Sequence, residues 1–492
     1  MPETDAGKKI FCLFTAVEAD PLVKVGGLGD VAFSLPNALR QLHPDEIGGH
    51  QIDVRLVLPC HSTACHAVEE GSFRIDFNVP TAMGVIPSQV FLTYIQEMPV
   101  YLISSELIPQ GTSVYTSDIH RDGLKFLFFS QAVLELSRAM DWDLDVVHVN
   151  DWHTAVIPHL LKRGKRAGVY PKKLKSLLTI HNLPFMGAGT QEAMRDLGIP
   201  FSNDRHLPAW GRRLPLPMGL SASDRLVAVS PSYAEEIKTP EYGNDLYDFL
   251  NLRADRLSGI INGLDTRLWD PATDRELLVR FTTDTLADRI QNKLALQKEL
   301  GLEENAGIPL LAFIGRLDQQ KGVDLIFDAL KKITRQTWQA VILGTGNAAL
   351  ENQARQMEED QPDRVRAAIK FDTRFSRRMY GGADILMMPS RYEPCGLAQM
   401  IAMRYGCIPL AHATGGLIDT ITDAVQPENA TGFLFEEGTA TALAKTIQKA
   451  LRLYKDKSTW EKMQINGMNR DFSWHQSALK YANLYLSLSD HN

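Results

Sequence analysis

The sequence has little of what metal-binding, membrane and nucleic-acid-binding proteins usually carry. No apolar run approaches the ~20 residues that span a bilayer, and the acidic segment 1–5 does not resemble a signal peptide. The net charge of −7 gives no reason to expect a nucleic acid or an anionic membrane as a partner. The five cysteines form no zinc-ligand pattern: Cys12, Cys60, Cys65, Cys395 and Cys407. We therefore expect a cytoplasmic protein with reduced thiols and no metal site.

What is present indicates two α/β domains. A chain of 492 residues, 44% hydrophobic and 23% charged, is too long for one core. Parallel strands are expected at 9–17, 51–58, 145–149, 174–180, 224–229, 309–315, 339–343, 384–388, 407–411 and 432–435. Helices are expected at 30–41, 122–140, 232–237, 323–333, 397–403, 441–454 and 477–488, and segments 89–94 and 100–103 fit an antiparallel pair. Repeated strand–helix units imply parallel sheets covered by helices.

Two segments follow such strands directly. They are Lys24-Val25-Gly26-Gly27-Leu28-Gly29-Asp30 and Ser390-Arg391-Tyr392-Glu393-Pro394-Cys395-Gly396-Leu397. Ligands of open α/β sheets bind at the carboxyl ends of strands. The domain boundary is expected between 237 and 309, where the glycines of 258–265 make a candidate hinge. One binding segment then falls in each domain.

The first segment combines a cation with a glycine-rich turn. Gly26 and Gly27 would let backbone N–H groups approach a ligand at a helix N-terminus. The spacing is neither that of a dinucleotide fingerprint nor that of a P-loop, so a plain strand–helix turn is an alternative. Lys24, placed directly before the glycines, favours phosphate or sugar oxygens as ligands.

A second cationic loop follows the strand at 309–315. Arg316 ends that strand, and Lys321 stands just before the next helix. Two fixed cations suit a diphosphate and would stabilise the charge that grows on a leaving phosphate. The alternative is a pair of solvated surface charges.

The turn after the strand at 384–388 carries Glu393 and Cys395. A carboxylate at this position can accept hydrogen bonds from the hydroxyls of a sugar or ribose. It can equally be an acid favoured by the helix dipole. A nucleophilic role for Cys395 is disfavoured, because no base is assigned to it.

Polar and aromatic side chains follow two strands of the first half. His148, Asp151, Trp152 and His153 follow one, and His181 and Asn182 follow the next. Imidazole, carboxylate and carboxamide groups beside a flat ring suit a polyhydroxylated ligand. A metal site is the alternative, although the spacing of the histidines is not that of a typical zinc motif. A lone core histidine is the alternative for His153.

Taken together, these segments resemble the bacterial glycogen synthases and plant starch synthases. The matching positions span nearly the whole chain: 24–30, 148–153, 181–183, 229–234, 262–265, 269–271, 316–317, 320–322, 381–384, 389–397, 399, 414–417 and 471–474. The resemblance implies a GT-B fold, in which two Rossmann-like domains face one cleft and the C-terminal helix crosses back. It places residues 1–255 and 474–492 in an acceptor-side domain and 256–473 in a donor domain.

The resemblance also implies an activity and the residues that carry it. The family transfers glucose from a nucleotide-glucose, usually ADP-glucose, to the non-reducing end of an α-1,4-glucan with retention, and it needs no metal or cofactor. Arg316 and Lys321 would hold the diphosphate, Glu393 would bind the transferred glucose, and Asp151 and His181 would contact that glucose from the other domain. Further binding positions are Lys24, Gly26, Gly27, Asp30, Asn182, Asn262, Cys395, Gly396, Leu397, Thr414, Gly415 and Gly416.

The chain departs from the family on the presumed acceptor side. Segment 201–220 is rich in Pro and Arg, and Pro184-Phe185-Met186-Gly187 replaces the usual continuation of the His-Asn-Leu motif. These departures keep two alternatives open: a GT-B enzyme that uses UDP-glucose or a small acceptor, and a catalytically silent glucan-binding relative. Arg316, Lys321 and Glu393 are all present, which favours the synthase.

Overall fold

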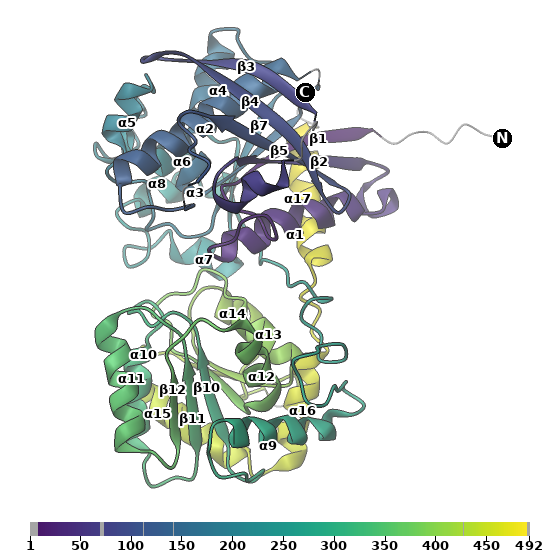
Figure 1. The fold of residues 1–492 in the computed structure, drawn as a ribbon, viewed down its shortest axis with the longest axis vertical. Helices are drawn as coiled ribbons and strands as arrows, with labels where there is room; N and C mark the ends of the chain where they lie inside the picture. Colours follow the sequence, from purple (N-terminus) through teal and green to yellow (C-terminus); the bar gives the residue numbers. More distant parts are fainter. Residues whose placement is uncertain (1–7, 69–72, 112, 141, 427, 490–492) are drawn as a thin grey trace, which may run out of the picture. The chain divides into compact units, whose positions relative to one another are not determined.

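The computed structural model describes residues 8–68, 73–111, 113–140, 142–426 and 428–489, so segment 1–5 lies outside the described residues. The chain folds into two compact units (Figure 1). The first unit runs to Gly263 and resumes at Trp474, and the second comprises Leu264–Ser473. Both units are α/β folds built around a largely or wholly parallel sheet, as the sequence predicts.

The first unit contains a nine-stranded sheet in the order β3-β4-β5-β2-β1-β6-β7-β8-β9. Pairing is parallel except at β3–β4 and β4–β5. The strands are β1 (Lys9–Thr15), β2 (Gln51–Pro59), β3 (Arg74–Thr81), β4 (Gly84–Ile95), β5 (Met98–Ser105), β6 (Val146–Asn150), β7 (Lys175–Ile180), β8 (Arg225–Ala228) and β9 (Leu257–Gly259). The helices are α1 (Gly27–Gln41), α2 (Ile119–Ala139), α3 (Asp151–Thr154), α4 (Val156–Arg166), α5 (Gln191–Asp196), α6 (Pro215–Ala222), α7 (Pro231–Glu236), α8 (Tyr247–Asn251) and α17 (Trp474–Ser489), with 3₁₀ turns η1 (Pro44–Ile47), η2 (Ser62–Ala67), η3 (Gly211–Arg213) and η4 (Ala254–Arg256).

The second unit contains a six-stranded parallel sheet in the order β12-β11-β10-β13-β14-β15. The strands are β10 (Leu310–Ile314), β11 (Gln339–Leu343), β12 (Val365–Ala368), β13 (Ile385–Met388), β14 (Ile408–His412) and β15 (Phe433–Phe435). The helices are α9 (Arg289–Glu299), α10 (Val323–Lys332), α11 (Ala348–Asp360), α12 (Thr373–Gly382), α13 (Ala398–Arg404), α14 (Gly416–Thr420), α15 (Ala440–Leu453) and α16 (Lys457–Met468), with the 3₁₀ turn η5 (Leu286–Asp288).

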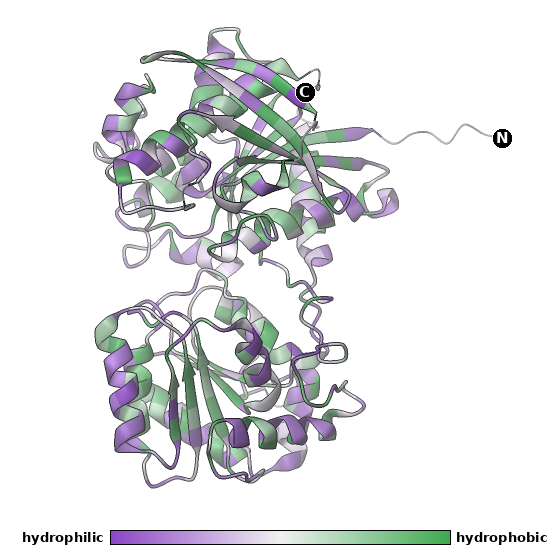
Figure 2. Cartoon of the chain, viewed as in Figure 1, coloured by the Kyte–Doolittle hydropathy of each residue, from purple (hydrophilic) through white to green (hydrophobic). Residues whose placement is uncertain are grey.

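Burial explains why the central strands were readable from sequence. All five residues of β11 are buried, and β10 has four buried residues and one half-buried. Figure 2 shows β10, β11 and β12 as largely apolar, whereas α11 turns a hydrophilic surface outward. Strands covered on both faces read as continuous apolar runs. β3 was not predicted, because only Phe77 and Val79 of its eight residues are buried.

The last helix returns to the first unit, as predicted. Helix α17 packs on α1, and the Tyr485 hydroxyl lies 2.6 Å from Nδ1 of His148 in β6. Ser477 Oγ donates to the carbonyl of Ile261 at 2.6 Å. The first unit continues past residue 255 because β9 pairs with β8. A Cβ atom on Gly263 would lie 2.4 Å from Trp474 Cα, so the two crossings of the chain are packed closely.

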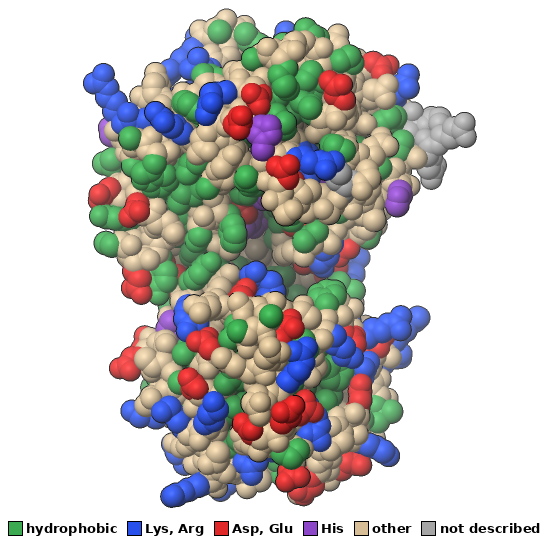
Figure 3. Space-filling model, turned by 60° about the vertical axis from the view of Figure 1, so that its left-hand side comes forward, with side chains coloured by type: hydrophobic (Ala, Val, Ile, Leu, Met, Phe, Trp, Pro, Cys, Tyr) green, Lys and Arg blue, Asp and Glu red, His purple; other side chains and the backbone are tan. Residues whose placement is uncertain are grey.

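The surface and the helices carry two further findings. No helix in the described ranges is both long and apolar enough to cross a membrane. On the face of each unit that Figure 3 shows, acidic and basic side chains are interspersed.

Candidate active site

Each sheet reverses its strand order at one point, and most of the predicted site residues follow the strands around it, whereas Asn262 follows the edge strand β9. In the first unit β1 neighbours β6, with β2 on one side and β7 on the other. In the second unit β10 neighbours β13, with β11 and β14 outside them. Such switch points leave a crevice at the carboxyl ends of the strands, where ligands bind. The structure thus gathers the residues into two groups, one per unit.

Lys321 and Glu393 form the centre of the group in the second unit. Lys321 Nζ lies 2.6 Å from Glu393 Oε2. Ser390 Oγ donates to the same oxygen at 2.9 Å, and the Glu393 side chain is only 6% exposed. A Cβ on Gly322, whose φ is +66°, would lie 2.1 Å from the Pro389 carbonyl oxygen. The loops after β10 and β13 therefore meet backbone to backbone and bring the cation to the carboxylate.

Arg316 lies in the same loop but reaches solvent. Its side chain is 64% exposed, and its guanidinium lies 3.0 Å from Asp318 Oδ2. It also donates to Gln320 Oε1 at 3.2 Å. Asp318 in turn accepts the backbone N–H of Lys321 at 2.9 Å. One carboxylate thus orients both cations of the loop, although only Lys321 is paired with Glu393.

The loops after β13 and β14 are packed against each other. A Cβ on Gly416 would lie 2.2 Å from the carbonyl oxygen of Cys395, a residue that is itself buried. The Gly416 N–H donates to the Glu393 carbonyl at 3.0 Å. This hydrogen bond ties the predicted binding residue Gly416 to the Glu393 loop. Thr414, Gly415, Gly396 and Leu397 belong to the same two loops.

One exposed aromatic residue at the carboxyl side of the same sheet was not among the predicted residues. Phe371 lies in the loop after β12 and is 88% exposed. Since neighbouring strands are about 4.8 Å apart, β12 stands roughly 10 Å from β10. A fully exposed ring at the carboxyl side of a sheet offers a flat apolar surface. The sequence indicates the exposure of this ring, because Phe371 stands alone between the charged residues Lys370 and Asp372.

In the first unit, Glu18 organises the glycine loop. The side chain is buried, and its Oε2 accepts the backbone N–H groups of Val25 at 2.5 Å and Gly26 at 2.9 Å. A Cβ on Gly29 would lie 3.1 Å from Lys24 Cγ and 3.4 Å from Glu18 Oε2. The glycines therefore let the loop wrap around an internal carboxylate. In this structure the Gly26 N–H binds Glu18, which was not among the predicted site residues.

Lys24 is held by one acid of its own loop and one acid of the first turn of α1. Its Nζ lies 2.5 Å from Asp30 Oδ1 and 3.3 Å from Asp20 Oδ2. The Lys24 side chain is 42% exposed. Asp30, predicted as a binding residue, thus acts here on the orientation of Lys24. Gly27 opens α1 beside them.

Asp151 is a buried carboxyl group in an unusual backbone conformation. It follows β6 with φ at +49°, a region that Asn and Asp tolerate better than most residues. Its Oδ1 accepts the N–H of His181 at 2.8 Å and approaches the N–H of Asn182 at 3.4 Å. Burial, aided by the charge of Glu18, raises the pKa of Asp151 from 3.8 to about 7. This group can therefore exist in either protonation state near neutrality.

The imidazoles beside Asp151 are kept neutral. Burial lowers the pKa of His181 to about 4 and that of His153 to about 3. His181 Nε2 lies 2.8 Å from the Asn150 side-chain oxygen, which can only accept, so Nε2 carries the proton. Among the described residues, the buried polar atoms of this unit without a hydrogen-bond partner include His153 Nδ1, Asn182 Oδ1 and Asn262 Oδ1. A buried polar atom without a partner calls for an explanation, and a bound water or ligand is one.

His148 does not join this group. Its Nδ1 lies 2.6 Å from the Tyr485 hydroxyl and its Nε2 2.7 Å from Thr179 Oγ1. Both ring nitrogens thus serve the core between β6, β7 and α17. Across the described residues, no set of three His, Cys, Asp or Glu side chains is arranged to hold a metal ion.

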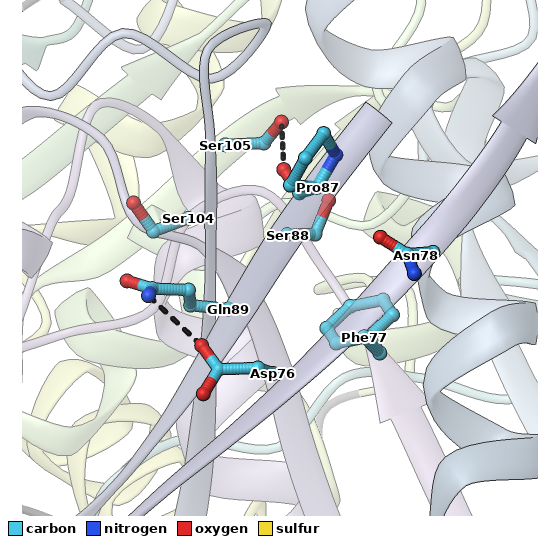
Figure 4. Close-up of a pocket in the computed structure, with 8 residues that line it drawn as sticks. All are labelled: Asp76, Phe77, Asn78, Pro87, Ser88, Gln89, Ser104 and Ser105. Atoms are coloured by element: carbon cyan, nitrogen blue, oxygen red, sulfur yellow. Dashed lines mark hydrogen bonds between the residues drawn. The ribbon is translucent and has the colours of Figure 1, made fainter. Parts of the chain in front are cut away.

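A pocket of about 340 Å³ lies elsewhere in the first unit, on strands β3, β4 and β5 (Figure 4). Its one titratable lining residue, Asp76, accepts a hydrogen bond from Gln89 at 2.9 Å. The lining residues are Asp76, Phe77, Asn78, Pro87, Ser88, Gln89, Ser104 and Ser105, and none of them is a predicted site residue.

Known proteins with the same two-part organisation identify the class. Residues 12–252 match the starch synthase catalytic domain, and residues 298–467 match the glycosyl transferases group 1. The catalytic domain of starch synthase IV from Arabidopsis thaliana, solved bound to ADP and acarbose, superimposes with a TM-score of 0.85 at 30% identity, covering 98% of this chain and all of that one. A sucrose-phosphate synthase from Thermosynechococcus elongatus, at 19% identity and a TM-score of 0.61, shares the fold. The fold and its two residue groups define a GT-B glycosyltransferase.

Full-length relatives narrow the class. The glycogen synthase of Cellvibrio japonicus is 38% identical over 97% of this chain and 99% of its own length. The glycogen synthase of Thermotoga maritima is 39% identical over 96% of this chain and 98% of its own. The chain belongs to the glycogen and starch synthase family.

Proposed function

We propose that this enzyme transfers glucose from ADP-glucose to the 4-hydroxyl at the non-reducing end of an α-1,4-glucan, with retention and without a metal ion. The observation that carries the proposal is the Lys321–Glu393 pair, 2.6 Å apart at the switch point of a sheet whose sequence belongs to this family. The ADP and acarbose bound to the related starch synthase support the choice of donor and of a glucan-like acceptor.

Lys321 and Arg316 are the proposed diphosphate-binding residues. As the bond between glucose and the diphosphate breaks, negative charge grows on the leaving group, and two oriented cations stabilise it. Arg316 is suited to phosphate because its planar guanidinium can donate two parallel hydrogen bonds. Its exposed ion pair with Asp318 is of the kind that is worth little in water, so exchange for a phosphate is not costly.

Glu393 is the proposed anchor of the transferred glucose. An ionised carboxylate only accepts hydrogen bonds, and sugar hydroxyls donate them. Ser390 and Lys321 already use one of its oxygens, Oε2, and this fixes the carboxylate plane. Phe371 is the proposed platform for the nucleobase, since its exposed ring offers a stacking face.

Asp151 and His181 are proposed to face the same glucose from the first unit. Positive charge develops on the sugar ring in a transition state of oxocarbenium character. A neutral His181 does not repel that charge, and its backbone N–H is held by Asp151. The ionised fraction of Asp151 near neutral pH stabilises the positive charge on the sugar ring electrostatically.

The test is glucosyl transfer from ADP-glucose, with UDP-glucose in parallel, to glycogen and to maltose, with product lengths resolved. Elongated chains that an α-amylase releases establish both the acceptor and the configuration. Nucleotide release without glucan growth points to a small acceptor. Absence of turnover with both donors by folded protein overturns the proposal in favour of a binding relative.

Arg316→Ala tests the proposed role of Arg316 in binding the diphosphate of the donor, and Arg335→Ala is the control variant. Both arginines are exposed in the second unit, but Arg335 follows α10 and lies away from the switch point. We expect the first variant to lose roughly 10²-fold in kcat and the second to keep it, by analogy with loss of one transition-state donor. Equal activities would contradict the role of Arg316.

A further inference from the structure

Two cysteines of the first unit are in close contact outside the site described above. Cys60 follows β2, and Cys65 lies in the 3₁₀ turn η2 (Ser62–Ala67). Their sulfur atoms are 2.7 Å apart, within about 0.7 Å of the ~2.05 Å length of a disulfide bond. Because only four residues separate them, little chain entropy is lost on closing this ring. The two thiols are therefore poised for covalent pairing.

One of the two thiols is accessible and the other is shielded. Cys65 is half-buried, whereas Cys60 is 1% exposed. The hydrogen bond that Cys60 donates lowers the pKa of Cys65, and the same bond together with burial raises the pKa of Cys60. Cys65 is thus the thiol that an oxidant meets first, and Cys60 is the thiol that completes the bond. Cys12 and Cys407 are fully buried.

The segment between the two cysteines supports the loop that carries Lys24. His61 Nε2 donates to the Val17 carbonyl at 2.8 Å, and His61 is fully buried. Thr63 Oγ1 donates to the Leu22 carbonyl at 2.5 Å. These contacts hold Val17 and Leu22, two residues that precede Lys24 in a loop closed by the backbone hydrogen bonds Ala19–Val23 and Asp20–Gly29. Movement of Cys65 towards Cys60 consequently moves two anchors of the Lys24 loop.

We propose that Cys60 and Cys65 form a reversible disulfide that alters the Lys24 loop and lowers glucosyl transfer. The part that concerns transfer rests on the proposed function; the bond and its effect on the loop do not. In a reducing compartment, protein disulfides are mostly transient and redox-sensing, and a short, half-exposed pair suits that behaviour.

The chemistry balances with a low-molecular-weight disulfide such as oxidised glutathione. The Cys65 thiolate attacks one sulfur of the oxidant, forms a mixed disulfide and releases one glutathione thiolate. Deprotonated Cys60 then attacks Cys65 Sγ, forms the Cys60–Cys65 bond and releases the second glutathione thiolate. The two cysteine thiols lose two electrons and two protons, and one glutathione disulfide becomes two glutathione molecules. A dithiol reverses both steps.

The first experiment measures the bond and the loop without reference to activity. The full chain is equilibrated in glutathione buffers of graded ratio, quenched with an alkylating agent, and mapped by peptide mass spectrometry. We expect a peptide linking Cys60 to Cys65 that dithiothreitol removes, together with at least a threefold change in hydrogen exchange for residues 16–30. Failure to form this bond, or unchanged exchange in 16–30 when it forms, overturns the proposal.

The second experiment measures transfer in the same samples. We expect kcat/KM to fall at least threefold in step with the bond and to return with dithiothreitol, and we expect Cys65→Ser and Cys60→Ser to be insensitive to glutathione disulfide. Cys12→Ser serves as the matched variant that keeps the response. Glutathione sensitivity that persists in Cys65→Ser overturns the regulatory role. If no variant transfers glucose at all, the proposed function fails, while the mapping and exchange results still decide the fate of the disulfide.

Discussion

The residue groups of the two units differ in how much charge they carry. In the second unit, the charged side chains Lys321 and Glu393 are paired, and Arg316 reaches solvent. In the first unit, the titratable groups Asp151 and His181 are buried, and their pKa values are displaced towards the neutral form. The group in the second unit thus carries fixed charge, which suits the proposed diphosphate, while the group in the first unit offers hydrogen-bonding side chains with little charge, which suit the proposed sugar. Changes of pH and of single side chains should therefore act differently on the two units.

The largest effect is expected on stability in mild acid, and it should be confined to the first unit. Burial lowers the pKa of His61, His159 and His181 to about 4 and of His153 to about 3, and it places that of His148 well below 6.5. Since the unfolded chain binds these protons first, stability present above pH 6.5 is lost as the pH falls towards 4. Each imidazole costs roughly 2 kcal/mol at pH 5.

Hydrogen exchange of each unit at pH 7 and pH 5, corrected for intrinsic rates, measures this difference. Parallel loss of protection in both units would contradict it.

Asp151→Asn tests a contribution to stability whose pH dependence is opposite to that of the histidines. The raised pKa of Asp151 means that its contribution is present below pH 4 and lost as the pH rises through about 7. The variant should therefore be more stable than wild type at pH 8, by up to about 4 kcal/mol.

Lys321→Ala should have the largest effect on catalysis. It removes a cation from the leaving diphosphate and leaves Glu393 buried without its ion pair. We expect kcat to fall by 10²–10³ or more, about 3–4 kcal/mol, with the fold retained. Steady-state kinetics beside circular dichroism measure both. Lys331→Ala, an exposed lysine of α10, should change nothing; turnover of Lys321→Ala within a few-fold of wild type would contradict the assignment.

Glu18→Ala should be weaker, because Glu18 positions the Lys24 loop without reaching the ligand. The loss of two charge-assisted hydrogen bonds, about 1.5–3 kcal/mol each, should lower kcat/KM by roughly 10–100-fold. The charge of Glu18 also raises the pKa of Asp151, so in this variant the acidic limb of the pH–rate profile, where Asp151 ionises, should shift to lower pH. A purely structural role would lower activity without moving the profile. Glu18→Gln, which keeps an acceptor, should restore part of the rate.

Phe371→Ala should give the smallest effect, on the donor alone. Loss of one stacking face costs about 0.5–1.5 kcal/mol, which raises the KM for ADP-glucose by roughly 3–10-fold. The KM of this variant for glucan should stay as in wild type. Phe73→Ala, which removes another exposed phenylalanine, should leave both KM values unchanged. An unchanged KM for ADP-glucose would contradict the proposal that Phe371 binds the nucleobase.

The sequence was sufficient for the buried parallel strands and for the position of two charged residues in the loops after them. The buried strands β10 and β11 could be read because all but one of their side chains are buried, and Lys321 and Glu393 could be placed because each follows such a strand. The hydrogen-bond partners of backbone N–H groups in the loops could not be predicted from the sequence. Whether the N–H of Gly26 or Gly416 meets a ligand, Glu18 or a carbonyl depends on how loops fold over each other. β3 was missed because it is polar on most positions.

The return of α17 has a consequence for the order in which the protein can be made. The first unit holds His148 against Tyr485 and Ile261 against Ser477, contacts that join residues made before the second unit to residues made after it. A ribosome therefore has to deliver the whole second unit before the first can close around α17. The second unit, a continuous stretch from Leu264 to Ser473, can fold while synthesis continues. The unit that begins the chain is thus the one that finishes last.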